Sequence, residues 1–162
     1  MAKRNWKRTA PTSLCNAMEL CVEFGRIRKN KSVEQIACDM GMPNHWTLYK
    51  WLESGRLPAN MIRPFELSTG ASYVTQFLAT SNHKLLIDIP TAKPANENDL
   101  LTLNSSFNDA LKVLEEFYKG KTSGDQTLRE LRNVMTGIAG HHARVESYAT
   151  PELGLFDEDS DQ

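Results

Sequence analysis

The stretch of sequence that decides the fold is residues 32–58, which read SVEQIACDMGMPNHWTLYKWLESGRLP. Ser32 with Gln35 three residues later has the pattern of a helix capping box, and a short apolar face follows it. Gly41 ends that first helix and Gly55 ends a second one. The spacing therefore predicts two short helices joined by a turn, in which Gly41 takes the left-handed conformation.

The residues of this stretch divide into an inward and an outward set. Ala37 is small where the second helix crosses the first. The inward candidates of the second helix are Trp46, Leu48, Trp51 and Leu52. The candidates that read DNA bases from the outward face, with the capping asparagine, are Asn44, His45, Thr47, Tyr49 and Lys50. Such a pair of helices predicts a helix-turn-helix, whose second helix enters the major groove of DNA. The alternative is an ordinary buried helical hairpin with a solvated face.

Ala37 and Gly41 lie four residues apart, and Leu48 begins the sequence Leu-Tyr-Lys-Trp. These features resemble the helix-turn-helix of temperate-phage regulators of the CII type, which carry Ile-x-Arg-Trp on the recognition helix. A middle segment at residues 62–89 and a helical C-terminal half are similar to that family as well. The common motif has inward residues where this chain has Thr47 and Lys50, so the turn here is one residue longer.

The resemblance implies a sequence-specific transcription regulator of a prophage or related mobile element. It further implies an activator of lysogenic establishment that binds double-stranded DNA as a homo-oligomer, a dimer or a tetramer. RNA polymerase is then a candidate partner, and the bacterial cytoplasm the expected location.

The charges of the chain are divided unevenly along its length. The formal net charge is −1, yet residues 1–66 carry 11 Lys and Arg against 6 Asp and Glu, whereas the rest carries 8 against 14. A basic front of this kind is expected where one part of a protein faces nucleic acid. The candidates for phosphate contacts are Lys3, Arg4, Lys7, Arg8, Arg26, Arg28, Lys29, Lys31 and Arg56. For the first four of these, a merely solubilising tail is an equal alternative.

The whole pattern predicts a mainly α-helical protein with an N-terminal helix-turn-helix bundle and a C-terminal antiparallel helical hairpin. The expected parts are a basic arm at 1–11, a DNA-binding domain at 12–90, a linker at 91–98, a hairpin at 99–149 and an acidic disordered tail at 150–162. The apolar run at residues 84–90 has the pattern of a short strand.

Both helices of the expected hairpin carry heptad rows with steps of three and four residues. The first row is Leu100, Leu103, Phe107, Ala110, Leu114 and Phe117; the second is Leu128, Leu131, Met135, Ile138, His142 and Val145. The rows either form the hairpin's own core or serve oligomerisation. The flanking apolar residues Leu101, Leu111, Tyr118, Val134 and Tyr148 favour oligomerisation, because they widen each stripe beyond what one partner helix needs.

The acidic tail contains one apolar segment, Glu-Leu-Gly-Leu-Phe, at residues 152–156. It resembles the short peptide by which bacterial replication proteins bind the sliding clamp. Its candidate anchors for a partner are Leu153, Leu155 and Phe156. The alternative function is therefore a DNA-associated adaptor or replication-linked protein that recruits such a partner through this tail.

No motif for catalysis, metal binding or a cofactor stands out in the sequence, so neither an enzyme nor a metal site is expected. The three cysteines are spaced like neither a disulfide framework nor a zinc site, which favours reduced thiols. No long apolar run is present, so no membrane span or signal peptide is expected.

Overall fold

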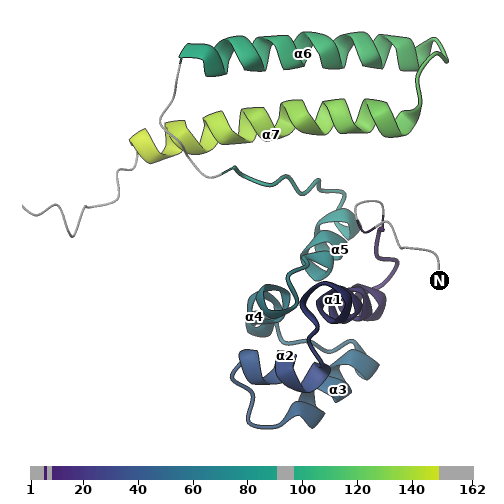
Figure 1. Ribbon diagram of the computed structural model, residues 1–162, viewed down its shortest axis with the longest axis vertical. Coiled ribbons are helices and arrows are strands. Elements are labelled where there is room, and N and C mark those ends of the chain that lie inside the picture. Colours follow the sequence, from purple (N-terminus) through teal and green to yellow (C-terminus); the bar gives the residue numbers. More distant parts are fainter. Residues whose placement is uncertain (1–5, 7–8, 91–96, 150–162) are drawn as a thin grey trace, which may run out of the picture. The chain divides into compact units, whose positions relative to one another are not determined.

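The structure is a computed structural model that describes residue 6, residues 9–90 and residues 97–149 of the 162-residue chain. The described residues form seven helices and no strand, which confirms the prediction of a mainly α-helical protein. Contacts divide the chain into unit 1, residues 1–86, and unit 2, residues 87–162. Helices α1 to α5 belong to unit 1, and α6 and α7 to unit 2 (Figure 1).

Unit 1 is built around α1 (Leu14–Lys29), which contacts α3, α4 and α5. The backbone N–H of Asn16 donates to Ser13 Oγ at 3.1 Å and caps the start of the helix. Gly25 lets α4 approach closely, since a Cβ at this position would lie 3.4 Å from the Cα of Thr69. The first helix thus supplies a surface against which the later helices are packed.

Helices α2 (Val33–Asp39) and α3 (His45–Ser54) follow and pack on each other. The N–H of Ser32 donates to Gln35 Oε1 at 2.8 Å, and the N–H of Gln35 donates to Ser32 Oγ at 3.3 Å. This reciprocal pair confirms the predicted capping box. Gly41 has a φ of +70°, the left-handed conformation expected of it in the turn.

Helices α4 (Ala59–Thr69) and α5 (Tyr73–Ser81) complete unit 1. The carboxylate of Glu66 accepts from the N–H of Thr75 at 2.8 Å and from its hydroxyl at 2.6 Å, which fixes the first turn of α5. The five helices enclose one apolar core. Its buried members are Ala17, Met18, Leu20, Cys21, Ile36, Ala37, Met40, Leu48, Phe65, Tyr73 and Val74.

Unit 2 contains α6 (Glu97–Tyr118) and α7 (Gly124–Ala149), which lie side by side and run antiparallel (Figure 1). The residues buried between them are small or β-branched: Ala110, Thr127 and Val134. Gly137 permits close approach, since a Cβ there would lie 3.0 Å from Leu103 Cδ1. We call these two helices the hairpin.

The heptad rows are not the buried surface of the hairpin. Six of their large apolar members are exposed: Leu100, Phe107, Phe117, Leu128, Ile138 and Val145. Leu103, Leu114, Leu131 and Met135 are half-buried, and Ala110 alone is buried in either row. The interpretation of the rows as the hairpin's own core is therefore wrong for the six exposed residues, because the small side chains beside them let the helices meet along a different line.

The expected strand at residues 84–90 is absent, and the segment has irregular backbone. The described part of the chain contains no strand, so the backbone groups of residues 84–90 have no neighbouring strand to pair with. Pro90 instead packs on α7, where a Cβ on Gly140 would lie 2.8 Å from Pro90 Cγ. The apolar residues of this run therefore do not alternate between the two faces of a sheet.

Candidate nucleic-acid interface

The outward side of α3 is the surface to which the sequence assigns DNA recognition. Leu48 is fully buried and anchors the helix, while Trp51 and Leu52 pack partly against the core. On the other side, Trp46 is 63% exposed and Tyr49 is 37% exposed. Lys50 is exposed and follows Tyr49 in the same turn of the helix. The core therefore leaves one side of α3 exposed.

Three rings gather at the beginning of α3. The ring centres of His45 and Trp46 are 5.1 Å apart, those of Trp46 and Tyr49 are 5.7 Å apart, and those of His45 and Tyr49 are 6.2 Å apart. These separations lie in the range of attractive ring contacts. We call His45, Trp46 and Tyr49 the aromatic cluster. It gives this surface an apolar patch with polar edges, suited to contacts with both methyl groups and hydrogen-bonding groups.

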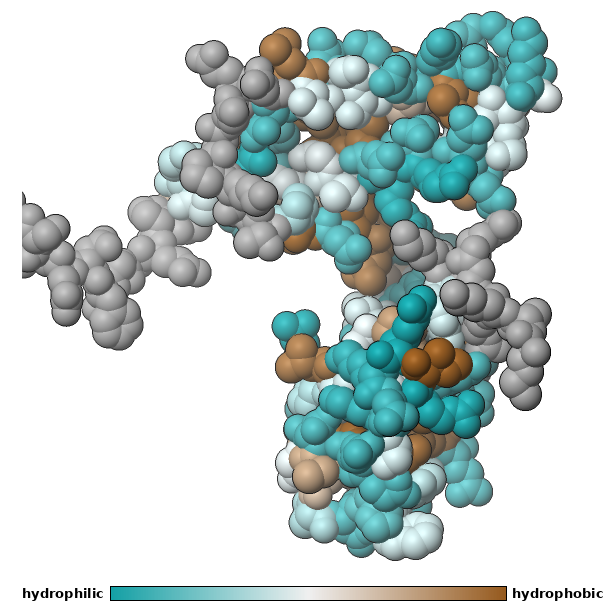
Figure 2. Space-filling model, viewed as in Figure 1, coloured by the Kyte–Doolittle hydropathy of each residue, from teal (hydrophilic) through white to brown (hydrophobic). Residues whose placement is uncertain are grey.

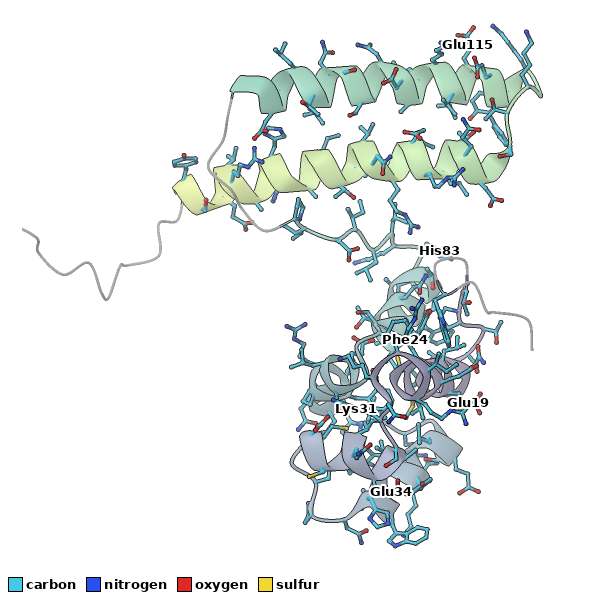
Figure 3. The ribbon with its side chains drawn as sticks, in the orientation of Figure 1. Glu19, Phe24, Lys31, Glu34, His83 and Glu115 are labelled. Carbon is cyan, nitrogen blue, oxygen red and sulfur yellow. The ribbon has the colours of Figure 1, made fainter. Side chains whose placement is uncertain are left out.

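A carboxylate from the preceding helix holds one ring of the aromatic cluster. The hydroxyl of Tyr49 donates to Glu34 Oε1 at 2.7 Å, and Glu34 is labelled in Figure 3 at the end of unit 1 that α2 and α3 form. Hydrogen bonds from Ser32 and, next, from Tyr49 lower the pKa of Glu34 to about 2. The same carboxylate raises the pKa of Tyr49. Glu34 is therefore ionised at neutral pH and fixes the orientation of the Tyr49 ring.

The capping residue Asn44 has a structural task as well. Its Oδ1 accepts from the N–H of Trp46 at 2.9 Å and caps the start of α3. That oxygen is engaged, which leaves the amide nitrogen of Asn44 as the group to offer a base. Asn44 and Gly55, whose φ is +71° at the end of α3, set the two ends of the helix.

Of the nine predicted phosphate-binding cations, five lie in the described part of the chain, and Lys29 and Lys31 are engaged inside unit 1. Lys29 Nζ donates to the carbonyls of Leu67 and Ser68 at 3.3 Å each, and Lys31 Nζ donates to the carbonyl of Ser68 at 3.1 Å. Cations near the last carbonyls of α4 suit the negative end of its dipole. These two lysines thus attach α1 and the following turn to α4.

Lys31 also forms an ion pair with Asp39, at the end of α2. The Ser68 hydroxyl donates to the same carboxylate at 2.7 Å. Lys31, first, and Ser68 lower the pKa of Asp39 below its usual value. The cluster connects α2 to α4, so Lys31 contributes to the packing that places α3. In contrast, Arg26, Arg28 and Arg56 are exposed and remain candidates for phosphate contacts.

Some predicted site residues lie outside the described residues. These are Lys3, Arg4, Lys7 and Arg8 of the basic arm and Leu153, Leu155 and Phe156 of the tail. Trp6 of the arm is described, and its ring packs edge-on against Phe24 with centres 5.3 Å apart. The hydroxyl of Tyr73 donates to the carbonyl of Trp6 at 3.0 Å.

The structure corrects the assignment of two neighbours on α3. Trp46, expected to point inward, is exposed, while Thr47, expected to face DNA, is half-buried. Leu48 fills the inward position at the centre of the helix. Trp46 comes two residues earlier and therefore lies on nearly the opposite side of the helix, which faces outward. Sequence reasoning thus placed Trp46 inward and missed Glu34 as a member of this surface. The one-residue longer turn had left open which of His45, Trp46 and Thr47 faces outward.

Replacing Ser32 with alanine is expected to lower the free energy of unfolding of unit 1 by about 1 kcal/mol, because the first turn of α2 loses its cap. Urea unfolding followed by tryptophan fluorescence measures this in unit 1 alone, since Trp6, Trp46 and Trp51 all lie there. Ser72→Ala is the matched control, because Ser72 precedes α5 without a side-chain capping bond. Equal losses in the two variants would contradict the capping role.

Comparison of the chain with protein-family models, with curated proteins and with solved structures found no match. Among the described residues no group of three or more His, Cys, Asp and Glu is arranged to hold a metal ion. Nor does any described helix combine the length and apolar character needed to cross a membrane.

Proposed function

We propose that unit 1 binds double-stranded DNA by placing α3 in the major groove, and that the chain is a sequence-specific transcription regulator of a prophage or mobile element. In this proposal the chain is a CII-like activator of lysogenic establishment that acts in the bacterial cytoplasm. The observation that carries the proposal is the outward side of α3, where Trp46, Tyr49 and Lys50 stand exposed beside the half-buried His45 on a helix anchored by Leu48.

The chemistry of this side suits base edges. The ammonium group of Lys50 donates to guanine O6 and N7, which are the acceptors of a G·C pair in the major groove. The exposed indole of Trp46 offers an apolar surface for a thymine methyl group, and the His45 ring carries hydrogen-bonding nitrogens beside it. Arg56 lies just beyond the end of α3, in position for a backbone phosphate next to the groove.

Glu34 places a carboxylate beside the aromatic cluster, and this charge opposes DNA binding. A carboxylate beside the phosphate backbone repels it, so the residue lowers the affinity for any duplex. In return, it fixes the ring of Tyr49 before DNA arrives, which favours one arrangement of contacts over others. We assign Glu34 a positioning role, which lowers the affinity for any duplex and raises the ratio of specific to random affinity.

Glu34→Ala is therefore expected to raise the affinity for random DNA while lowering the ratio of specific to random affinity. The fall in the ratio is about 2-fold to 10-fold, as expected for the loss of one exposed hydrogen bond. Fluorescence anisotropy with labelled duplexes measures both affinities. Glu53→Ala removes the same charge from the exposed surface of α3 and should leave the ratio unchanged; an equal fall there would refute the positioning role.

The experiment that tests the proposed function is selection of bound duplexes from a random-sequence pool by the full chain. An enriched motif supports sequence-specific binding, and the spacing of its half-sites reports the symmetry of the bound assembly. Recovery of DNA without any enriched motif, or no recovery at low salt, excludes the proposal.

A second candidate function is an adaptor that recruits a protein partner. The aromatic cluster itself favours this alternative, because exposed Trp and Tyr are enriched at protein interfaces. Under this function Trp46→Ala abolishes partner capture and the DNA selection yields no motif. The sliding clamp is the partner to test with the tail, by comparing capture by the full chain with capture by a chain lacking residues 151–162.

A further inference from the structure

Unit 1 contains a cavity of about 500 Å³, which is lined by residue 6, by α1, by the turn between α4 and α5 and by the first residue of α5. No residue of α2 or α3 lines it, so it is separate from the aromatic cluster. Its volume lies in the range of roughly 300–1,000 Å³ that small-molecule sites occupy. We call it the α1–α5 cavity.

Three aromatic rings form walls of the α1–α5 cavity: Trp6, Phe24 and Tyr73. The planes of the Trp6 and Phe24 rings are 85° apart, with centres separated by 5.3 Å, and the centres of Trp6 and Tyr73 are 6.3 Å apart. Phe24 is labelled in Figure 3. Most of the surface of unit 1 that Figure 2 shows is hydrophilic, so an aromatic cavity is unusual for this unit. Rings in this arrangement suit a flat apolar ligand.

The walls offer few hydrogen-bonding groups to such a ligand. The Tyr73 hydroxyl already donates to the carbonyl of Trp6 at 3.0 Å, and the Phe24 ring has no such group. Ala71 also lines the cavity, and its carbonyl accepts from the Cys21 thiol at 3.3 Å. A nucleobase carries several polar edge atoms, each of which needs a partner when it loses water. The cavity therefore favours a hydrocarbon ring over a nucleobase.

Positive charge borders the aromatic walls. Arg28 lines the cavity and follows Phe24 by four residues, so the two side chains lie on the same side of α1. Gly70 lines the cavity as well, and a Cβ on Gly70 would lie 2.6 Å from Lys29 Nζ. The ammonium group of Lys29 is therefore held next to the cavity, and the two cations favour an anionic ligand.

The shape of the Arg28 side chain indicates which anion fits. A guanidinium group is a planar fork, and it matches the two oxygens of a carboxylate. Glu66 is the acid that bonds the first turn of α5, but its two oxygens accept from the N–H and the hydroxyl of Thr75. Glu66 is thus held by Thr75, which leaves Arg28 for a carboxylate from outside the chain.

We propose that the α1–α5 cavity binds a small aromatic carboxylate, with its ring against Trp6, Phe24 and Tyr73 and its carboxylate on Arg28. The site goes beyond the proposed function, because its argument uses no property of DNA binding. One consequence rests on that function: Arg28 is also a candidate for a phosphate contact, so a bound carboxylate would compete with DNA for this cation.

The test is calorimetric titration of the full chain, without DNA, with naphthoate as a two-ring aromatic carboxylate. One molecule is expected to bind per chain. Arg28→Ala is expected to weaken this binding by about 10-fold, because a charge-assisted hydrogen bond is lost. Arg26→Ala is the matched control. Arg26 is also exposed in the last turn of α1 but does not line the cavity, so this variant should bind naphthoate like the wild type.

Naphthamide has the same rings without the charge. It is expected to bind the wild type about as weakly as naphthoate binds Arg28→Ala, and it should not distinguish the wild type from that variant. A wild type that binds no naphthoate at millimolar concentration overturns the proposal, as does equal weakening by Arg26→Ala and Arg28→Ala. Loss of binding in Trp46→Ala would place the ligand on the aromatic cluster instead. Guanosine monophosphate bound as tightly as naphthoate would show a phosphate site, and either result also overturns the proposal.

Discussion

Lys50→Ala is expected to weaken binding of the full chain to its selected DNA by about 10-fold to 100-fold, the equivalent of roughly 1–3 kcal/mol for one base contact. Lys50 is exposed on the outward side of α3, where the core makes no use of it. The affinity for random DNA should fall much less, because only one of many cations is removed. Fluorescence anisotropy with the selected duplex and with a scrambled duplex measures the two effects.

Lys84→Ala is the matched control for Lys50→Ala. Lys84 is also exposed in unit 1, but it lies after α5 and outside α3. The Lys84→Ala variant removes the same charge and should change the affinity for both duplexes slightly and equally. If the two variants behave alike on the selected duplex, Lys50 contributes charge alone, and the assignment of α3 as the reading helix fails.

Phe65→Ala is expected to lower the free energy of unfolding of unit 1 by about 3–5 kcal/mol. Phe65 is the largest of the fully buried side chains, and it comes from α4, in the middle of the core shared by the helices of unit 1. Since whole domains are stable by only about 5–15 kcal/mol, a loss of this size leaves a substantial unfolded fraction at growth temperature. Urea unfolding followed by tryptophan fluorescence again reports unit 1.

Leu67→Ala is the control on the same helix. Leu67 is exposed, so its truncation should change the free energy of unfolding by no more than about 0.5 kcal/mol. The circular dichroism of the hairpin should survive in both variants, because α6 and α7 belong to the other unit. Similar losses for Phe65→Ala and Leu67→Ala would contradict the core described above.

The parts of the fold that follow from local rules could be predicted from the sequence. The capping box at Ser32 and Gln35 and the left-handed Gly41 depend only on residues a few positions apart. The inward direction of Leu48 was predicted as well, since it follows from the helical period. These features fix the ends of α2 and the inward side of α3, which is much of what positions the candidate site.

Features set by packing between helices could not be predicted. Trp46 is a large apolar-bodied residue of α3, yet Leu48 takes the buried position and the Trp46 ring stands exposed. The link from Glu34 to Tyr49 joins residues fifteen positions apart on different helices, and no local spacing indicates it. On the hairpin, small residues and large residues repeat with the same period, and only the packed structure shows which of them face inward.

The hydrogen bond from the Tyr73 hydroxyl to the carbonyl of Trp6 attaches the chain to α5 at residue 6. Two residues lie between Lys3 and Trp6, so the Cα atom of Lys3 can lie no more than about 11 Å from the Cα atom of Trp6. A full turn of B-form DNA rises by roughly 34 Å. Under the proposed DNA binding, Lys3 is therefore expected to reach phosphates within only about a third of one turn from Trp6. Insertion of residues between Lys3 and Trp6, rather than added charge, is the change expected to extend that reach.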